Sequence, residues 1–265
     1  MDIASLLGLI SGIIFIILAI LFSSGYDFAA IGAFGDPGSV MVVIGGTVAS
    51  VFIAQPLSRV LGAIGAVKFV FMPPKFDHGE AISRIITLSN LARREGVLAL
   101  EASAQNMDDP FLKKGVMLIV DGGEPELVRS VLETEMSFVE NRHNDLRAVW
   151  DMVASFAPAW GMVGTMVALV LMMQNLSDAE ALAQGMALAM ITTFYGAIMA
   201  NFFAIPFSKK LGVYNSEEML LKEILLEGML SIQAGENPRI IEEKLKAFLS
   251  PKLRVEEAGG SGGES

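Results

Sequence analysis

The amino-acid sequence predicts an all-α polytopic membrane protein with four transmembrane helices and a helical cytoplasmic domain. Hydrophobic residues make up 53% of the chain and charged residues only 18%, which are too few charges to cover the surface of a soluble domain. The apolar residues are concentrated in four stretches without a charge, and all 19 Lys and Arg residues lie outside those stretches. Composition and charge distribution therefore point to the same fold class.

The four charge-free stretches are residues 3–22, 38–54, 152–173 and 181–207. A bilayer core about 30 Å thick needs roughly 17–25 helical residues, so the second stretch is at the short limit and the fourth is longer than needed. We expect residues 181–185 to form a loop or an interfacial turn. The first stretch lacks the basic start and the cleavage site of a signal peptide, so we expect it to be retained.

The charges on the connections predict the orientation of the spans. The connections 23–37 and 174–180 carry acidic residues and no Lys or Arg, whereas the basic residues fall between Arg59 and Arg147 or between Lys209 and Arg254. Cytoplasmic connections are enriched in Lys and Arg. The pattern therefore predicts that both termini are cytoplasmic.

The charged segments have helical periodicity. Apolar residues at helical spacing run from Ile82 to Leu91 and from Phe111 to Leu118, and an unbroken pattern from Glu126 into the third stretch predicts one helix over 126–173. A further helix is predicted over 220–232, and Pro238 is placed to open a last one through Leu249. We thus divide the chain into spans one and two (1–56), a cytoplasmic domain (57–148), spans three and four (149–207), C-terminal helices (208–251) and a tail (252–265) with the Gly/Ser composition of a flexible linker.

Several classes of function are disfavoured by composition. A net charge of −10 without a basic cluster argues against nucleic acid as a partner. The absence of cysteine excludes a disulfide framework, a thiolate metal site and a cysteine nucleophile. His78 and His143 are far apart in sequence, and we find neither a phosphate-binding Gly-rich loop nor paired metal ligands. We therefore expect no enzyme activity, no cofactor and no metal site.

Small and hydroxyl residues share one face on each of the last two spans. They are Pro158, Gly161, Thr165 and Ala168 in the third span, and Ala189, Thr193, Gly196, Ala197 and Ala200 in the fourth. Such a face lets another helix approach closely, and a hydroxyl on it can offer oxygen to a cation. We expect the two small faces to face each other, so that the hydroxyls of Thr165 and Thr193 converge. The alternative is that each hydroxyl only bonds the carbonyl one turn earlier, that the small faces are ordinary packing surfaces, and that Pro158 is only a kink.

Ionisable residues are missing from all four stretches, which contain no Asp, Glu, His, Lys or Arg. Proton and sodium relays through a bilayer normally need an ionisable group that binds and releases the ion. The chain therefore cannot be the only ion carrier. If it conducts ions, a partner helix docked on the small faces must supply the carboxylate.

Short runs of residues along 1–251 form a pattern that is typical of one protein family. Each matching run is short, but their order and their placement on four spans make the match specific. The main runs are Phe156-Ala157-Pro158-Ala159-Trp160-Gly161-Met162-Val163-Gly164-Thr165, Thr192-Thr193-Phe194-Tyr195-Gly196-Ala197-Ile198, and Leu91-Ala92-Arg93-Arg94-Glu95-Gly96-Val97-Leu98-Ala99-Leu100-Glu101, with Glu236-Asn237-Pro238-Arg239 near the end. With these runs the sequence resembles the MotA/PomA family of flagellar stator subunits over residues 1–251.

The resemblance implies a bacterial inner-membrane assembly. Five copies would surround two copies of a MotB/PomB-type partner, whose membrane helix supplies an ion-binding aspartate, and cation flow would drive torque on the rotor through the switch protein FliG. Membrane lipid would cover the outer spans, because the small faces occur only on spans three and four. An ExbB/TolQ-type energising subunit is the alternative, although that class typically has three spans and an outside N-terminus. A purely structural membrane anchor is a third possibility.

The resemblance also implies roles for individual residues. Pro158 corresponds to a proline that couples ion flow to conformational change, and Arg93 and Glu101 correspond to charges that face the rotor, with Arg94 beside them. Threonines matching Thr165 and Thr193 occur in sodium-driven members, which favours sodium over protons, although Ser155 and Ala102 stand where some relatives carry acidic residues. We assign the ion pathway to Thr165, Thr193 and Thr192, and contact with the partner helix to Pro158, Gly161, Ala168, Gly196, Ala197 and Ala200.

Overall fold

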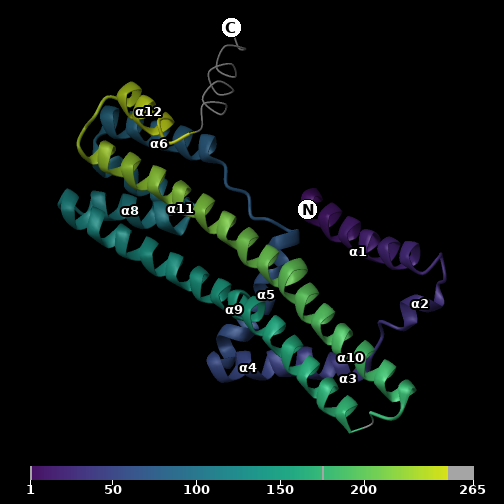
Figure 1. The fold of residues 1–265 in the computed structure, drawn as a ribbon. Helices are drawn as coiled ribbons and strands as arrows, with labels where there is room; N and C mark the ends of the chain where they lie inside the picture. Colours follow the sequence, from purple (N-terminus) through teal and green to yellow (C-terminus); the bar gives the residue numbers. More distant parts are fainter. Residues whose placement is uncertain (1, 175, 250–265) are drawn as a thin grey trace. The chain divides into compact units, whose positions relative to one another are not determined.

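A computed structural model describes residues 2–174 and 176–249, and this part of the chain is almost entirely helical, without a β-strand (Figure 1). Among the described residues, four helices are long and apolar enough to cross a membrane: Ile3–Ser23, Pro37–Ala54, Pro125–Met173 and Ala179–Gln233. The predictions of an all-α fold and of four spans are confirmed. The predicted tail, 252–265, and the last two residues of the predicted C-terminal segment lie outside the described residues.

The chain forms two compact units. The span unit consists of Met1–Pro74 and Arg142–Tyr214, and the core unit consists of Lys75–Asn141 and Asn215–Ser265. The span unit extends beyond residue 56 because helix α5 (Leu57–Phe71) packs within it. Val60 and Ala63 of α5 are buried in one cluster with Val51 and Val149.

The first half of the span unit contains α1 (Ile3–Ser23), α2 (Ala29–Gly32), α3 (Pro37–Val40), the π-helical turn η1 (Met41–Gly45) and α4 (Gly46–Ala54). The second span is the continuous run of α3, η1 and α4. It begins where Asp36 accepts a hydrogen bond from the Ser39 amide and Pro37 occupies the first turn, two features typical of a helix start.

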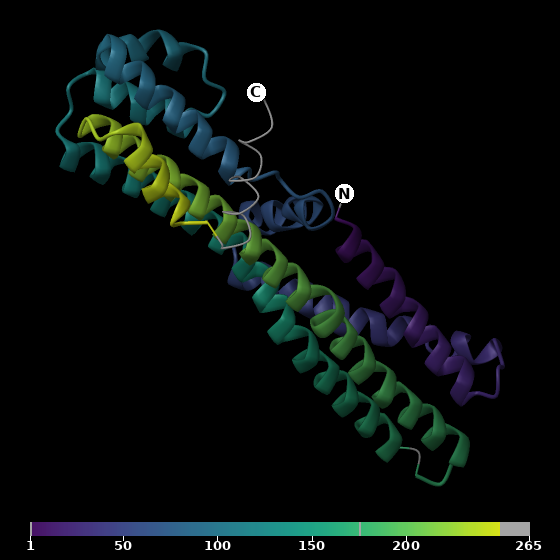
Figure 2. The same ribbon diagram turned by 90° about the horizontal axis from the view of Figure 1, so that it is seen from above.

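The second half of the span unit is a pair of long helices. The end of α9 (Pro125–Met173) and α10 (Ala179–Ile198) lie side by side and antiparallel (Figures 1 and 2). The prediction of a loop or turn over residues 181–185 is wrong. Helix α10 already begins at Ala179, because the Asp178 carboxylate accepts hydrogen bonds from the backbone amides of Glu180 and Ala181.

Helix α10 also continues further than predicted. It passes through a second π-helical turn, η3 (Met199–Ala204), into α11 (Ile205–Gln233). The fourth span and the helix predicted over 220–232 therefore belong to one helical run, Ala179–Gln233. Pro206 does not interrupt it, because it lies in the second position of α11, next to the π-turn.

The core unit is a small helical domain. It comprises α6 (His78–Glu95), the 3₁₀ turn η2 (Val97–Ala99), α7 (Leu100–Gln105), α8 (Pro110–Val120), α12 (Pro238–Lys246), the start of α9 and the end of α11. The predicted helix over 126–173 is confirmed, and the last helix begins at Pro238 as predicted but ends at Lys246 rather than at Leu249. Large side chains that are almost fully buried fill the domain: Ile85, Leu100, Phe111, Leu112, Leu132, Ile224, Met229, Ile241 and Leu245. Each contributes about 1.5–3 kcal/mol by leaving water.

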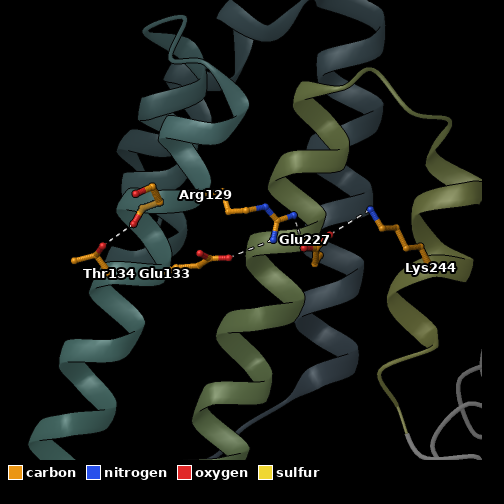
Figure 3. A network of polar contacts seen from close by, with 6 residues as sticks. Arg129, Glu133, Thr134, Glu227 and Lys244 are labelled. Carbon is orange, nitrogen blue, oxygen red and sulfur yellow. Dashed lines mark hydrogen bonds and ion pairs between the residues drawn. The ribbon is translucent and has the colours of Figure 1, made fainter.

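A charged network joins three helices of the core unit (Figure 3). Arg129 of α9 contacts Glu227 of α11 at 2.7 Å, and Lys244 of α12 contacts the same carboxylate at 3.3 Å. Burial raises the pKa of Glu227, but the hydrogen bonds and charges of Arg129 and Lys244 outweigh it, so this pKa lies below its ordinary value. The same contact raises the pKa of Arg129.

Candidate functional site

Two threonine hydroxyls meet between α9 and α10. The Oγ1 atoms of Thr165 and Thr193 lie 2.9 Å apart, and both also lie near the carbonyl oxygen of Ala189, at 3.2 Å and 3.1 Å. The Thr165 hydroxyl is 3.1 Å from the carbonyl oxygen of Gly161 as well. The expectation that the small faces of the two spans face each other is confirmed. Four oxygens from two helices therefore gather at one point.

The hydroxyls also make the ordinary bonds of threonine in a membrane helix. Thr165 and Thr193 each reach the carbonyl one turn earlier, on Gly161 and Ala189, as the alternative interpretation predicts. Thr192 donates to the Ala189 carbonyl at 3.0 Å and is buried, whereas Thr193 is exposed. The pair is thus satisfied without an ion, and its oxygens remain accessible from the Thr193 side.

Glycines bring the backbones of α9 and α10 into contact. A Cβ atom on Gly196 would lie 2.6 Å from the carbonyl oxygen of Ala157 and 3.1 Å from the Cα atom of Pro158. A Cβ atom on Gly161 would lie 3.0 Å from the Thr192 carbonyl oxygen. Because these neighbours are backbone atoms, they cannot move aside as a flexible side chain would. The glycines are therefore required for the hydroxyls to meet.

The residues predicted to contact a partner helix are divided between the interior and the surface. Those buried within the chain are Gly161, Ala168, Gly196 and Ala200, whereas Pro158 is half-buried and Ala197 is exposed. Gly161 and Gly196 are part of the contact between α9 and α10 itself. Contact of these six residues with a partner stays a prediction, and Ala197 is the one whose side chain is open to it.

Exposed methionines flank the hydroxyl pair, a feature that was not singled out from the sequence. Met162 and Met166 of α9 are 61% and 60% exposed, and Met190 of α10 is 68% exposed. Met is flexible and polarizable, so it can fit apolar partners of varied shape. In the sequence, the spacing of four residues between Met162 and Met166 indicates that both lie on one face of α9. With Thr193 and Ala197, these residues form an exposed face that suits an apolar helix.

The three charges assigned to the rotor lie around one turn of the core unit. Arg93 and Arg94 are in the last turn of α6, and Glu101 is in the first turn of α7. Gly96, with a φ of 88°, turns the chain between them. All three charged side chains are exposed. Leu98 in this turn is 73% exposed, so the turn presents an apolar side chain beside the three charges.

Comparison with known proteins places this arrangement in a family. The sequence profile described as the MotA/TolQ/ExbB proton channel family matches residues 103–224. The chain is 38% identical to motility protein A of Treponema pallidum, with 97% of each chain covered. The chain belongs to the motility protein A (MotA) family. It is also 35% identical to the chemotaxis protein PomA of Vibrio alginolyticus, over 96% of this chain and 98% of that protein.

Solved structures agree with this assignment. The MotAB structure from C. jejuni superposes with a TM-score of 0.87 at 26% identity, covering 95% of this chain and 97% of that one. The flagellar MotAB stator complex of Bacillus subtilis gives a TM-score of 0.85 at 29% identity, covering 96% and 98%. The predicted resemblance to MotA-type stator subunits is confirmed. This is a family of channel and motor subunits rather than of enzymes. The preference for sodium stays a prediction.

Proposed function

We propose that this MotA-family chain is a stator subunit of the bacterial flagellar motor, which forms a cation channel with a MotB/PomB-type partner and converts ion flow into torque. The supporting observation is the combination of accessible hydroxyl oxygens with membrane stretches, residues 152–173 and 181–207, that contain no Asp, Glu, His, Lys or Arg. Such a site can lower the cost of dehydrating a cation, but it cannot hold the ion by charge. The carboxylate must come from the partner's membrane helix.

The ring and its orientation are part of the same proposal. The chain is a multi-pass inner-membrane protein with both termini in the cytoplasm. The connections 23–37 and 174–180 lack Lys and Arg, whereas the segments on the other side of the membrane carry all the basic residues, which favours the cytoplasm for those segments. Five copies surround a partner dimer, with α9 and α10 inward and α1 outward against lipid. Exposed apolar side chains along α1, including Ile10, Phe15 and Leu18, fit a lipid environment. Arg93, Arg94 and Glu101 then contact FliG.

The transported ion in this proposal is sodium. Sodium must exchange part of its hydration shell for protein oxygens in a narrow site, whereas proton transfer needs no such shell. The hydroxyls of Thr165 and Thr193 and the carbonyl of Ala189 offer neutral oxygens within hydrogen-bonding distance of one another. Together with the partner's carboxylate they would complete a sodium site.

The test is complementation of a motile strain that lacks its own stator. The chain and the partner encoded beside it are expressed together, and swimming speed is measured while sodium is replaced by potassium at constant pH and ionic strength. We expect motility that depends on the partner and on sodium. A speed that stays flat would show a proton-driven stator, and energised outer-membrane transport without motility would favour the ExbB/TolQ-type function.

A further inference from the structure

The outer connection between the first two spans is tied to α10 close to the hydroxyl pair. The phenol of Tyr195 donates a hydrogen bond to the backbone carbonyl of Phe34. The rings of Phe34 and Phe194 are also in contact, with 5.2 Å between their centroids. Phe194 and Tyr195, the two residues of α10 that directly follow Thr193, therefore both contact Phe34 of the connection.

The Phe34 carbonyl is a fixed acceptor, because the connection is itself ordered. Its short helix α2 begins with an Asp27 carboxylate bonded to the Ala29 amide at 2.8 Å. Phe34 donates its own amide to Ile31 at 3.1 Å. Two residues further on, Asp36 accepts a hydrogen bond from the Ser39 amide at the start of the second span. Structure on both sides thus holds the acceptor in place.

Tyr195 and Thr193 lie on opposite sides of α10. Residues two apart on an α-helix are separated by about 200° around its axis. The bond to Phe34 therefore anchors the side of α10 away from the hydroxyl pair. A rotation of α10 that breaks this bond would also turn Thr193 away from Thr165.

The contact between α9 and α10 restrains such a rotation on one side of α10. It is built on Gly161 and Gly196, which set how closely the two backbones approach. Gly161 and Gly196 have no side chains that interlock with the neighbouring helix, and the side chain that does interlock is that of Thr192, against Gly164. The Tyr195 bond adds a restraint on the opposite side of α10.

We propose that Tyr195 is a positioning residue for the hydroxyl pair: its hydrogen bond to Phe34 sets the rotation of α10 at which Thr193 meets Thr165. The geometric part of this inference is independent of the ion. The consequence for ion binding rests on the function proposed above, because it requires the hydroxyl pair to lie on the ion pathway.

Disulfide trapping tests the geometry directly. The chain contains no cysteine, so Thr165→Cys and Thr193→Cys give one defined pair in each copy of the chain within the complex with its partner. We expect oxidation to join them readily when Tyr195 is present and several-fold more slowly with Tyr195→Phe. Phe194→Leu, which removes the ring contact and keeps the hydrogen bond, should slow it less. Tyr26→Phe in the same outer connection, where the ring is 66% exposed, is the matched control and should have no effect. Equal rates in all variants at equal membrane levels would overturn the proposal.

Sodium dependence separates this proposal from the proposed function. With both threonines intact, Tyr195→Phe should raise the sodium concentration for half-maximal swimming speed several-fold and leave the speed at saturating sodium nearly unchanged. A merely structural role would instead lower the speed at every sodium concentration, which would contradict positioning of the ion site. Slower trapping with an unchanged sodium dependence would support the positioning of α10 by Tyr195 and would refute the role of the hydroxyl pair in ion passage.

Discussion

The hydroxyl oxygens of Thr165 and Thr193 lie 2.9 Å apart across the contact between α9 and α10. Both hydroxyls already donate hydrogen bonds to backbone carbonyls within the chain, so neither needs an ion to satisfy its hydrogen bonding. Removing one should therefore affect ion passage more than folding. Because the two effects are separate, single substitutions at Thr165 or Thr193 can test the role of the pair in ion passage.

Thr165→Ala removes one oxygen of the pair and should abolish most sodium-driven swimming. The helix should remain intact, because alanine is a good helix former. Thr165→Ser keeps the hydroxyl and should retain most of the speed. Swimming speed against sodium concentration, at matched membrane levels of the complex, provides the measurement. Full speed in the alanine variant would remove Thr165 from the ion pathway.

Gly196→Ala should destabilise the span unit. The new methyl group would lie 2.6 Å from the backbone oxygen of Ala157, and overpacking of this kind costs about 1–3 kcal/mol. Gly8→Ala in α1 is the matched control, because a Cβ atom there meets nothing within 4 Å. Thermal unfolding of the purified complex in detergent should show a lower midpoint only for Gly196→Ala. Equal midpoints would mean that the close approach of the two helices is not needed.

Reversal of the charges around Gly96 should impair torque without removing the protein from the membrane. Exposed charge pairs are worth only about 0–1 kcal/mol each, so Arg93→Glu alone should give a partial loss of swimming. The combination with changes at Arg94 and Glu101 should be severe. A charge-reversed FliG should partly restore Arg93→Glu. Unchanged torque in the triple variant would end this assignment.

The network around Glu227 should make the stability of the core unit dependent on pH. The pKa of Glu227 is depressed in the folded chain, so its contribution is fully present above the unfolded-state pKa of about 4.5. It is lost as pH falls through the lower, folded-state pKa. Glu227→Gln should lower the unfolding midpoint at pH 7 and reduce its fall towards acid pH. Glu133→Gln, on a more exposed carboxylate, should change neither. A Glu227→Gln curve parallel to that of the parent would contradict this account.

Much of the architecture follows from local sequence signals. Four charge-free stretches define the spans, and Pro238 marks the start of the last helix, because hydrophobicity and capping act locally. Span length alone does not predict that residues 181–185 are helical. The Asp178 cap, a short-range signal, extends α10 towards its start.

The candidate site was only partly predictable. The small faces predicted that Thr165 and Thr193 would meet, since small residues at helical spacing permit close approach. The sequence could not show which small residues would pack between α9 and α10 and which would stay free for a partner, because burial of Gly161 and Gly196 depends on how the two helices pair. The Tyr195 bond to Phe34 joins residues 161 positions apart, and no periodicity predicts such a contact.

The π-helical turn η3 has a consequence for how this chain tolerates changes in length. A π-turn accommodates about one residue more than an α-turn. Deleting one residue within Met199–Ala204 would therefore be absorbed as a return to regular α-helix. The same deletion one turn earlier, beside Thr193, would leave a helix out of phase by about 100°. Insertions and deletions among natural variants of this span should accordingly gather at η3 and avoid the helix before it.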